Sequence, residues 1–289
     1  MAQRGAVAQA IHRQARTASR ALGRVTAGSR LEPDFLIVGA QRCGTTSLYK
    51  TLAEHPDVLP AGLHKGVHYF DTDYERGPLW YRSHFPTKVR ARVAEQHRGV
   101  RPITGEASPY YMFHPLAPER IARDLPEARL VVLLRDPVER AYSAYVHERA
   151  RGFESLSFED ALAAEPERLA GEEDRLVREP GYVSRVHQHN AYLARGRYVD
   201  QLERLEAQVG RDRLCVVDAD ELFVDFTTGF SRVRDFLGLA EWMPATFEQR
   251  NARPRTKLEP EVRARLEDHF AQYDERLAAW WGRTPQWRA

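Results

Sequence analysis

The stretch from Phe35 to Leu52, FLIVGAQRCGTTSLYKTL, contains the residue types and spacing best suited to binding an anion. An apolar run leads into a turn bounded by Gly39 and Gly44, and hydroxyl side chains follow at once. The first N–H groups of a helix lack partners within it, and the helix dipole favours negative charge there. Glycine also lets the backbone approach a bulky oxyanion. The stretch predicts a phosphate- or sulfate-binding loop, with a plain strand–helix connection as the alternative.

The loop lacks the lysine that follows the second glycine in nucleotide-hydrolysing P-loops. Thr45 occupies that position, and the cation inside the turn is Arg42. Because that lysine neutralises the terminal phosphates beside Mg²⁺, its absence favours a metal-free group transfer. Asp218 and Asp220 are weak candidates for a metal ligand, so no metal site is predicted. The residues expected to hold the anion are Gln41, Arg42, Cys43, Gly44, Thr45, Thr46 and Ser47.

A second anion-binding point is predicted where the apolar run RLVVLLR ends. Arg135 closes this run, and Ser143 lies two turns into the helix that we expect to start at Pro137. By itself, Arg135 suits helix capping or pairing with Asp136 equally well. Two anion points at two parallel-strand ends, however, match a nucleotide that carries phosphates at both its 5′ and its 3′ positions.

The elements that must position these residues alternate between strand and helix. We expect strands at 35–38, 129–135 and 213–218, a strand leading into a loop at 103–112, and a strand–turn at 64–71. Helices are expected at 46–54, 77–85, 118–125, 188–206, 228–237 and 259–281 and from Pro137 through His147. Residues 152–180 read as a helix with a mobile loop, a candidate lid. The alternation predicts an α/β fold, a single domain with a P-loop-like central parallel sheet and helices on both faces.

Composition narrows the classes of function. A net charge of +2 over 289 residues argues against a nucleic-acid partner. Two distant cysteines indicate a reducing compartment, and no apolar run is long enough to span a membrane, which predicts a cytoplasmic protein. Residues 1–31 contain six Arg and no acid and are expected to form a disordered basic tail before a domain at 32–289. A targeting peptide and an amphipathic helix are the alternatives for the tail.

Four segments in order resemble the PAPS-dependent sulfotransferase family, and above all its carbohydrate branch of heparan-sulfate-type enzymes and their bacterial relatives. These segments are FLIVGAQRCGTTSLYKTLAEHPDV, HKGVHYFD with WYRSHFP, RLVVLLRDPVERAYSAYVH, and ARPRTKLEPEVRARLEDHF. The resemblance implies 3′-phosphoadenosine 5′-phosphosulfate (PAPS) as co-substrate. It also implies metal-independent, in-line transfer of a sulfuryl group to a hydroxyl of a carbohydrate, glycolipid or secondary metabolite. Arg135 and Ser143 would bind the 3′-phosphate, with Arg253 and Arg255 near the nucleotide.

Sulfuryl transfer needs a general base and a group that stabilises the leaving phosphate. Arg42 stands where the family usually has Lys, and it would stabilise charge without donating a proton. The usual Glu before the Val-His-aromatic run is Gly66 here, so His68 becomes the best base, oriented by Asp71. Glu106 is another candidate carboxylate. The residues expected to bind the acceptor are Lys65, His68, Trp80 and Tyr110.

Two other functions fit parts of the sequence. A small-molecule kinase with a P-loop would require Mg²⁺ and the missing lysine. A non-catalytic protein that binds adenosine bisphosphate would explain the absence of Glu at Gly66. The sequence identifies neither the acceptor nor the oligomeric state.

Overall fold

In the computed structural model, which describes residues 23, 25–62, 65–247 and 256–289, four parallel strands form one sheet in the order β2-β1-β3-β4. The strands are β1 (Phe35–Gly39), β2 (Gly105–Ala107), β3 (Arg129–Leu134) and β4 (Leu214–Asp218). Apart from Arg129, every residue in them is buried. Such strands require cover on both faces, since neither face can meet water.

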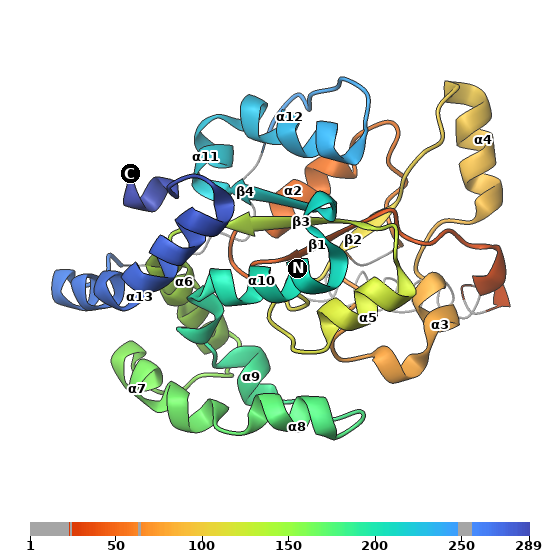
Figure 1. Cartoon of the computed structure of the whole chain (residues 1–289). Coiled ribbons are helices and arrows are strands. Elements are labelled where there is room, and N and C mark those ends of the chain that lie inside the picture. The colour runs from red at the N-terminus through yellow and green to blue at the C-terminus, as the bar shows by residue number, and fades with distance from the viewer. Residues whose placement is uncertain (1–22, 24, 63–64, 248–255) are drawn as a thin grey trace, which may run out of the picture.

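Helices provide that cover, and Figure 1 shows them on both sides of the strands. On the upper side in that view lie α2 (Thr45–Leu52), α11 (Ala219–Val224) and α12 (Phe226–Leu237). On the lower side lie α5 (Ala117–Asp124), α6 (Pro137–Ala150) and α10 (Tyr198–Val209), and α13 (Pro260–Trp281) packs on α6 and α10. The predicted α/β fold with a P-loop-like central parallel sheet in a single domain is confirmed.

Further helices lie away from the sheet. They are α3 (Pro78–Arg82), α4 (Lys88–Arg98), α7 (Phe158–Leu169), α8 (Glu172–Arg178) and α9 (Arg185–His189), with short 3-10 turns at Ala27–Ser29, Tyr74–Arg76, Ala194–Gly196, Arg211–Arg213 and Gln286–Arg288. In Figure 1, α7, α8 and α9 form a group below the sheet, and α3 and α4 lie beside its β2 edge. A second apolar cluster joins α6, α7 and α13 around the fully buried Tyr192.

The parallel register brings the two predicted anion points to one edge of the sheet. Phe35 pairs with Arg129 and Gly39 with Val132, so β1 and β3 end side by side. The N–H of Ala40 donates to the carbonyl of Leu133 over 2.8 Å, which continues this pairing beyond the end of β1. The loop after β1 and the residues after β3 therefore face the same region, as in other open parallel sheets that bind ligands at their carboxyl edge.

Two of the predicted elements have the wrong secondary structure. The segment 64–71 is not a strand over its described residues 65–71, which form bends and turns. The helix expected at 188–206 is interrupted between α9 and α10. The buried carboxylate of Glu165 accepts the N–H groups of Tyr192, Leu193 and Ala194 at 2.7–2.8 Å, and a continuous helix would use these groups internally.

Other expectations need smaller corrections. The helix expected at 77–85 is limited to the five residues of α3. Helix α4 escaped prediction because charged residues interrupt its apolar positions and Ala91 is its one buried residue. The candidate lid at 152–180 contains two helices, α7 and α8, and its buried Glu154 is bound by Arg168, Asn190 and Tyr192. The predicted tail falls mostly outside the described residues.

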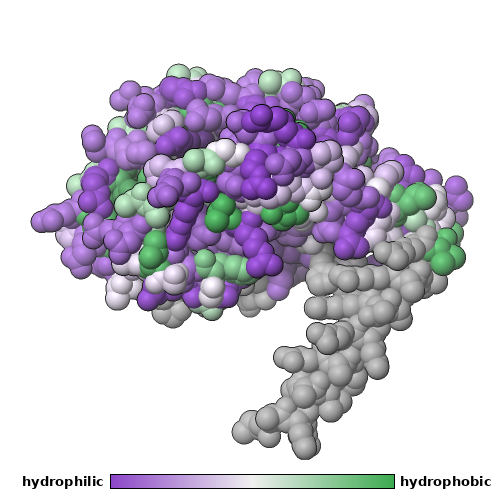
Figure 2. Space-filling model, turned by 90° about the horizontal axis from the view of Figure 1, so that it is seen from below, coloured by the Kyte–Doolittle hydropathy of each residue, from purple (hydrophilic) through white to green (hydrophobic). Residues whose placement is uncertain are grey.

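The surface is mainly polar where it is described. Figure 2 shows a predominantly hydrophilic face on which apolar residues lie singly or in small groups, the usual pattern for a globular protein. Among the described residues, no helix is both long and apolar enough to cross a bilayer.

Candidate functional site

The loop between β1 and α2 is shaped around Gly44. This residue has a φ of 85° at the N-cap of α2, and a Cβ there would lie 2.8 Å from the ring of Phe223. Only glycine satisfies both constraints. Within the described part of the chain, nothing accepts a hydrogen bond from the N–H groups of Gly44 and Thr45. These two donors at the start of a helix therefore suit an oxyanion.

The other predicted loop residues support this arrangement. The side chains of Thr45 and Ser47 are buried. Cys43 is fully buried, with its Sγ 3.8 Å from the Tyr198 hydroxyl, and burial raises the pKa of its thiol to about 11. A neutral thiol in this place packs the loop against α10 and does not react as a nucleophile.

Arg42 extends from the loop to α6. Its backbone is in the left-handed region, with φ 74°. Its Nε donates to Ser143 Oγ over 3.1 Å, and Nη1 lies 3.5 Å from Nδ1 of His147. The sequence predicted two separate anion points, one at the loop with Arg42 and one formed by Arg135 and Ser143. The structure brings them into direct contact.

Arg135 lies directly after β3, as predicted. Its guanidinium is 3.5 Å from Asp220 and 3.8 Å from Glu139, so both ion pairs are long. Asp136 instead caps α6 by accepting the N–H of Val138 over 2.8 Å. Neither alternative considered for Arg135 occurs: it does not pair with Asp136 among the ion pairs of the described residues, and the Asp136 carboxylate caps the helix in its place.

Asp218 and Asp220, the weak metal candidates, have other roles in the structure. Asp218 is fully buried at the N-cap of α11, where it accepts the N–H groups of Asp220, Glu221 and Gln286. Burial raises the pKa of Asp218, and these hydrogen bonds oppose that rise. Its carboxylate stabilises the end of β4 and the start of α11.

A cavity of about 400 Å³ opens beside the loop. Its lining residues are Gln41, Lys65, Gly66, His68, Ala107, Pro109, Tyr110, Arg151, Gln188, His189 and Arg195. Five of them have basic side chains and none is an acid. Of the loop residues 39–46, Gln41 contributes to the wall. The cavity is therefore in contact with the anion loop and has a positive lining.

His68 and Asp71 form a hydrogen-bonded pair at this cavity. Nδ1 of His68 is 2.8 Å from Oδ2 of Asp71, and the His68 side chain is 40% exposed while that of Asp71 is fully buried. Burial would lower the pKa of His68, but the hydrogen bond and the charge of Asp71 outweigh it and raise the pKa. A carboxylate at Nδ1 keeps the proton there, which leaves the Nε2 lone pair to act as a base.

Glu106 is buried behind His68 and is absent from the cavity wall. It accepts hydrogen bonds from the N–H of Val67 (3.0 Å) and from the hydroxyls of Ser108 (2.7 Å), Tyr111 (2.7 Å) and Tyr81 (3.4 Å). Burial raises its pKa against the effect of these bonds. The predicted catalytic carboxylate thus lies in the protein interior, where it positions the segment that carries His68.

No side chain fits at residue 66. A Cβ on Gly66 would lie 2.7 Å from the carbonyl oxygen of Ala107 and 3.1 Å from Oγ of Ser108. The segment 65–67 packs directly on the end of β2, and the N–H of Ala107 donates to the Lys65 carbonyl over 2.7 Å. Burial lowers the pKa of the Lys65 ammonium to about 8. The packing excludes the Glu that the family usually has at position 66.

The remaining predicted residues fall in different places. Tyr110 lines the cavity, and its hydroxyl bonds to Nδ1 of the buried His187 over 2.7 Å. Trp80 does not line it, because Trp80 packs against His84 and Tyr69 on the far side of the 65–71 segment. Arg253 and Arg255 lie outside the described residues.

Four polar or charged wall residues were not predicted: Arg151, Gln188, His189 and Arg195. Arg151 and His189 both pair with the buried Glu148 at 3.1 Å. All four lie in segments without a recognisable motif. In such segments the sequence does not distinguish a polar residue that is exposed to solvent from one that faces a site. Arg151 follows α6, Gln188 and His189 end α9, and Arg195 lies in the 3-10 turn Ala194–Gly196, so only the tertiary fold brings the four together at the cavity.

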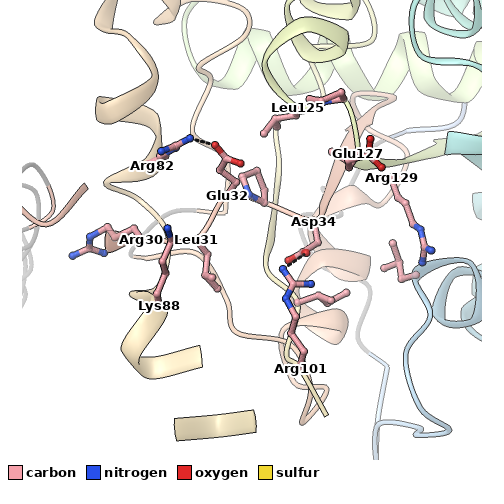
Figure 3. A pocket seen from close by; sticks show the side chains of 15 residues that line it. Arg30, Leu31, Glu32, Asp34, Arg82, Lys88, Arg101, Leu125, Glu127 and Arg129 are labelled. Carbon is pink, nitrogen blue, oxygen red and sulfur yellow. Dashed lines mark hydrogen bonds and ion pairs between the residues drawn. The ribbon is translucent and has the colours of Figure 1, made fainter. Parts of the chain in front are cut away.

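A larger cavity of about 580 Å³ lies at the opposite edge of the sheet. Figure 3 shows its wall, in which Arg82 pairs with Glu32 and Arg101 pairs with Asp34. Asp34 precedes β1 and Arg129 begins β3, so this cavity is at the amino ends of the strands. Open parallel sheets bind their ligands at the carboxyl ends, which favours the smaller cavity as the active site.

The fold and the site together define a P-loop-like α/β enzyme that transfers a charged group. Its anion loop has Thr45 in place of the usual P-loop lysine and carries its cation at Arg42, and a His–Asp pair lines the same basic cavity as the loop.

The chain belongs to the sulfotransferase family, because the family model of the sulfotransferase domain matches residues 32–259. It is 30% identical over 218 residues to heparan sulfate glucosamine 3-O-sulfotransferase 3B1 of Mus musculus (74% of this chain, 48% of that protein). Bifunctional heparan sulfate N-deacetylase/N-sulfotransferase 3 of Homo sapiens is 30% identical over 215 residues (72% of this chain, 22% of that protein). The solved sulfotransferase from Alicyclobacillus acidocaldarius has a TM-score of 0.64 and 29% identity, over 88% of this chain and 97% of that chain.

The chain spans less than half the length of these two curated relatives. The family match confirms the predicted membership and the enzyme class of sulfotransferases. It also argues against the first alternative, a P-loop kinase.

We predict that Gly66→Ala disturbs the site and destabilises the protein. The added Cβ meets backbone at 2.7 Å, so the 65–67 segment must shift, at a cost of about 1–3 kcal/mol in the free energy of unfolding. Urea unfolding measures this change. The matched control is Gly28→Ala, because a Cβ at Gly28 has nothing within 4 Å. Equal stability of the two variants would show that residue 66 tolerates a side chain.

Proposed function

We propose that the protein transfers a sulfuryl group from PAPS to a hydroxyl of a carbohydrate-type acceptor, by in-line displacement and without a metal ion. A sugar, a glycolipid and a glycosylated secondary metabolite all belong to this class. The observation that carries the proposal is the cavity whose wall contains both Gln41 of the anion loop and His68 of the His–Asp pair. A donor held by the loop and an acceptor hydroxyl at His68 would meet there.

The loop and the start of α6 would bind the nucleotide. The N–H groups of Gly44 and Thr45, with the hydroxyls of the loop, suit the 5′-phosphosulfate. Arg135 and Ser143 suit the 3′-phosphate, and both lie at the same sheet edge as the loop. Arg42 would leave Ser143 and stabilise the charge that develops on the bridging phosphate oxygen. Since arginine keeps its proton, it does this as a cation and not as an acid.

His68 would act as the general base. Its Nε2 takes the proton of the acceptor hydroxyl while the acceptor oxygen forms a bond to sulfur. The bond between sulfur and the bridging oxygen breaks, and its electron pair leaves with adenosine 3′,5′-bisphosphate (PAP). Asp71 holds the ring and stabilises the imidazolium that results. Glu106 and Ser108 position the backbone of this segment through Val67 and His68.

The charge of the cavity favours an acceptor with an anionic group near the reacting hydroxyl. Lys65, Arg151 and Arg195 lie in the wall together with two histidines, and the wall contains no carboxylate. The relatives named for heparan sulfate act, by their names, on a carbohydrate. We propose an acidic saccharide as the preferred acceptor class for this protein.

PAP binding tests the nucleotide assignment. Isothermal titration in the presence of a chelator should show tight binding of PAP, and Arg135→Ala should weaken it about tenfold or more, because a charge-assisted contact to phosphate is lost. Arg178→Ala is the control, since among the described residues Arg178 pairs only with Asp174 on the surface of α8. A protein that binds Mg-ATP in preference to PAP would contradict the proposal.

The pH dependence tests the His–Asp pair. Asp71 raises the pKa of His68, so the base is fully deprotonated only above that raised pKa, and activity should rise with pH through it. Asp71→Asn removes the carboxylate charge and should move the His68 midpoint to lower pH. NMR titration of the His68 ring measures this midpoint without an acceptor. A midpoint that stays in place in Asp71→Asn would remove Asp71 from the mechanism.

Acceptor charge is tested with a matched pair of substrates, a uronate-containing oligosaccharide and its carboxyl-reduced form. The acidic form should have the lower KM in a labelled-PAPS assay. Arg151→Gln should raise the KM of the acidic form about tenfold, the effect of one charge-assisted hydrogen bond, and should leave the neutral form unchanged. Equal KM values for the two substrates would show that the cavity does not select charge.

A further inference from the structure

Arg195 is a buried cation without an acidic partner. Its side chain lies between α9 and α10, and the residue is 3% exposed. Within the described residues, no carboxylate oxygen lies within 4.0 Å of its nitrogens. Burial lowers its pKa to about 10, so it remains charged at neutral pH. Since burying an unpaired charge is costly, the contacts that hold this guanidinium determine what it does.

Those contacts reach two parts of the chain. Nη2 donates to the carbonyls of His187 (3.0 Å) and Gln188 (2.7 Å), which are close in sequence. The guanidinium lies over the rings of Tyr110 and Phe113, at 4.8 and 4.9 Å from their centres. Nη1 instead donates to the side-chain oxygen of Gln41, 154 residues earlier in the chain. Arg195 thus links the far wall of the cavity to the anion loop.

This contact fixes the orientation of the Gln41 amide. A guanidinium has only donors, so the oxygen of Gln41 must face Arg195 and its NH₂ must point elsewhere. No described residue accepts a hydrogen bond from that NH₂, and it is not among the buried nitrogens that lack a partner. Gln41 lines the cavity beside Lys65 and His68. Its NH₂ is therefore an accessible donor at the point where the loop meets the cavity.

We propose that Arg195 is a positioning residue, which holds the Gln41 amide so that its NH₂ donates to the sulfuryl group of PAPS. The inference rests on the proposed function and assigns two residues to the transferring group itself. The sulfuryl oxygens lie between the loop and His68 during in-line transfer, and a fixed donor there stabilises their charge without reorganisation. Without Arg195 the amide can rotate by half a turn and present its oxygen to the sulfuryl group.

The test compares the affinities for PAPS and PAP, because only PAPS carries the sulfuryl group. Calorimetry is done on the full chain with Gln41→Met, Arg195→Met and the double variant. Gln41→Met should weaken PAPS about tenfold and PAP less than about threefold, as expected for one hydrogen bond to a charged group. Arg195→Met should likewise lower the ratio of the affinity for PAPS to the affinity for PAP. In the double variant, loss of Arg195 should change the ratio no further, because Arg195 acts through Gln41.

The control is Arg197→Met, two residues away, whose guanidinium lies over Tyr273 and not against the loop. It should leave the ratio unchanged. If Arg195→Met fails to fold, Arg195→Lys tests the same point. Because the lysine ammonium holds the Gln41 amide less firmly than a guanidinium, this variant should lower the affinity for PAPS relative to PAP by less than Gln41→Met does. Equal weakening of PAPS and PAP, or additive effects in the double variant, would make Arg195 a structural residue only. A wild-type protein that binds neither nucleotide would instead overturn the proposed function.

Discussion

The buried carboxylate of Glu106 is the constraint on which the acceptor side of the site depends. It lies in β2, the short edge strand, and accepts four hydrogen bonds, one of them from the backbone of Val67. A buried carboxylate is tolerated only when such donors surround it, and buried donors left without it would be equally costly. The segment 65–71 has no regular secondary structure, so this network fixes its position relative to the sheet.

The position of that segment supports our proposal that His68, and not residue 66, provides the base. Because residues 65–67 lie directly on Ala107 and Ser108, the backbone fills the space in which a side chain at Gly66 would stand. We propose that the base comes instead from a neighbouring position that faces the cavity. His68 does so with φ 59°, a backbone conformation that is rare for residues other than glycine and that is held here by its N–H bond to Ser108. The absence of Glu at position 66 and the His–Asp pair are thus two results of the same packing.

The sequence predicts those parts of the molecule that are encoded locally. The strands are short apolar runs, and the loop between β1 and α2 is one contiguous segment, so the fold class and the strand–loop–helix arrangement at 35–52 follow from the sequence alone. The break between α9 and α10 depends on Glu165, about 30 residues away, and no periodicity reveals it. Arg195 lies in that break and lines the cavity from it. Trp80 was predicted to bind the acceptor but packs against Tyr69 and His84 instead. The sequence does not distinguish an aromatic residue that lines a site from one that packs behind it.

The cavity is lined by basic groups, and the acids that pair with them lie behind its wall. Two acids near the site lie behind the wall: Asp71 pairs with His68, and Glu148 pairs with His189 and Arg151. Each acid fixes a basic group without exposing negative charge to the cavity. Arg195 differs, because carbonyl oxygens and aromatic rings hold it, and its charge remains uncompensated. A reaction in which an anionic group passes between two oxygens benefits from such fixed donors, since they do not have to reorient as the charge moves.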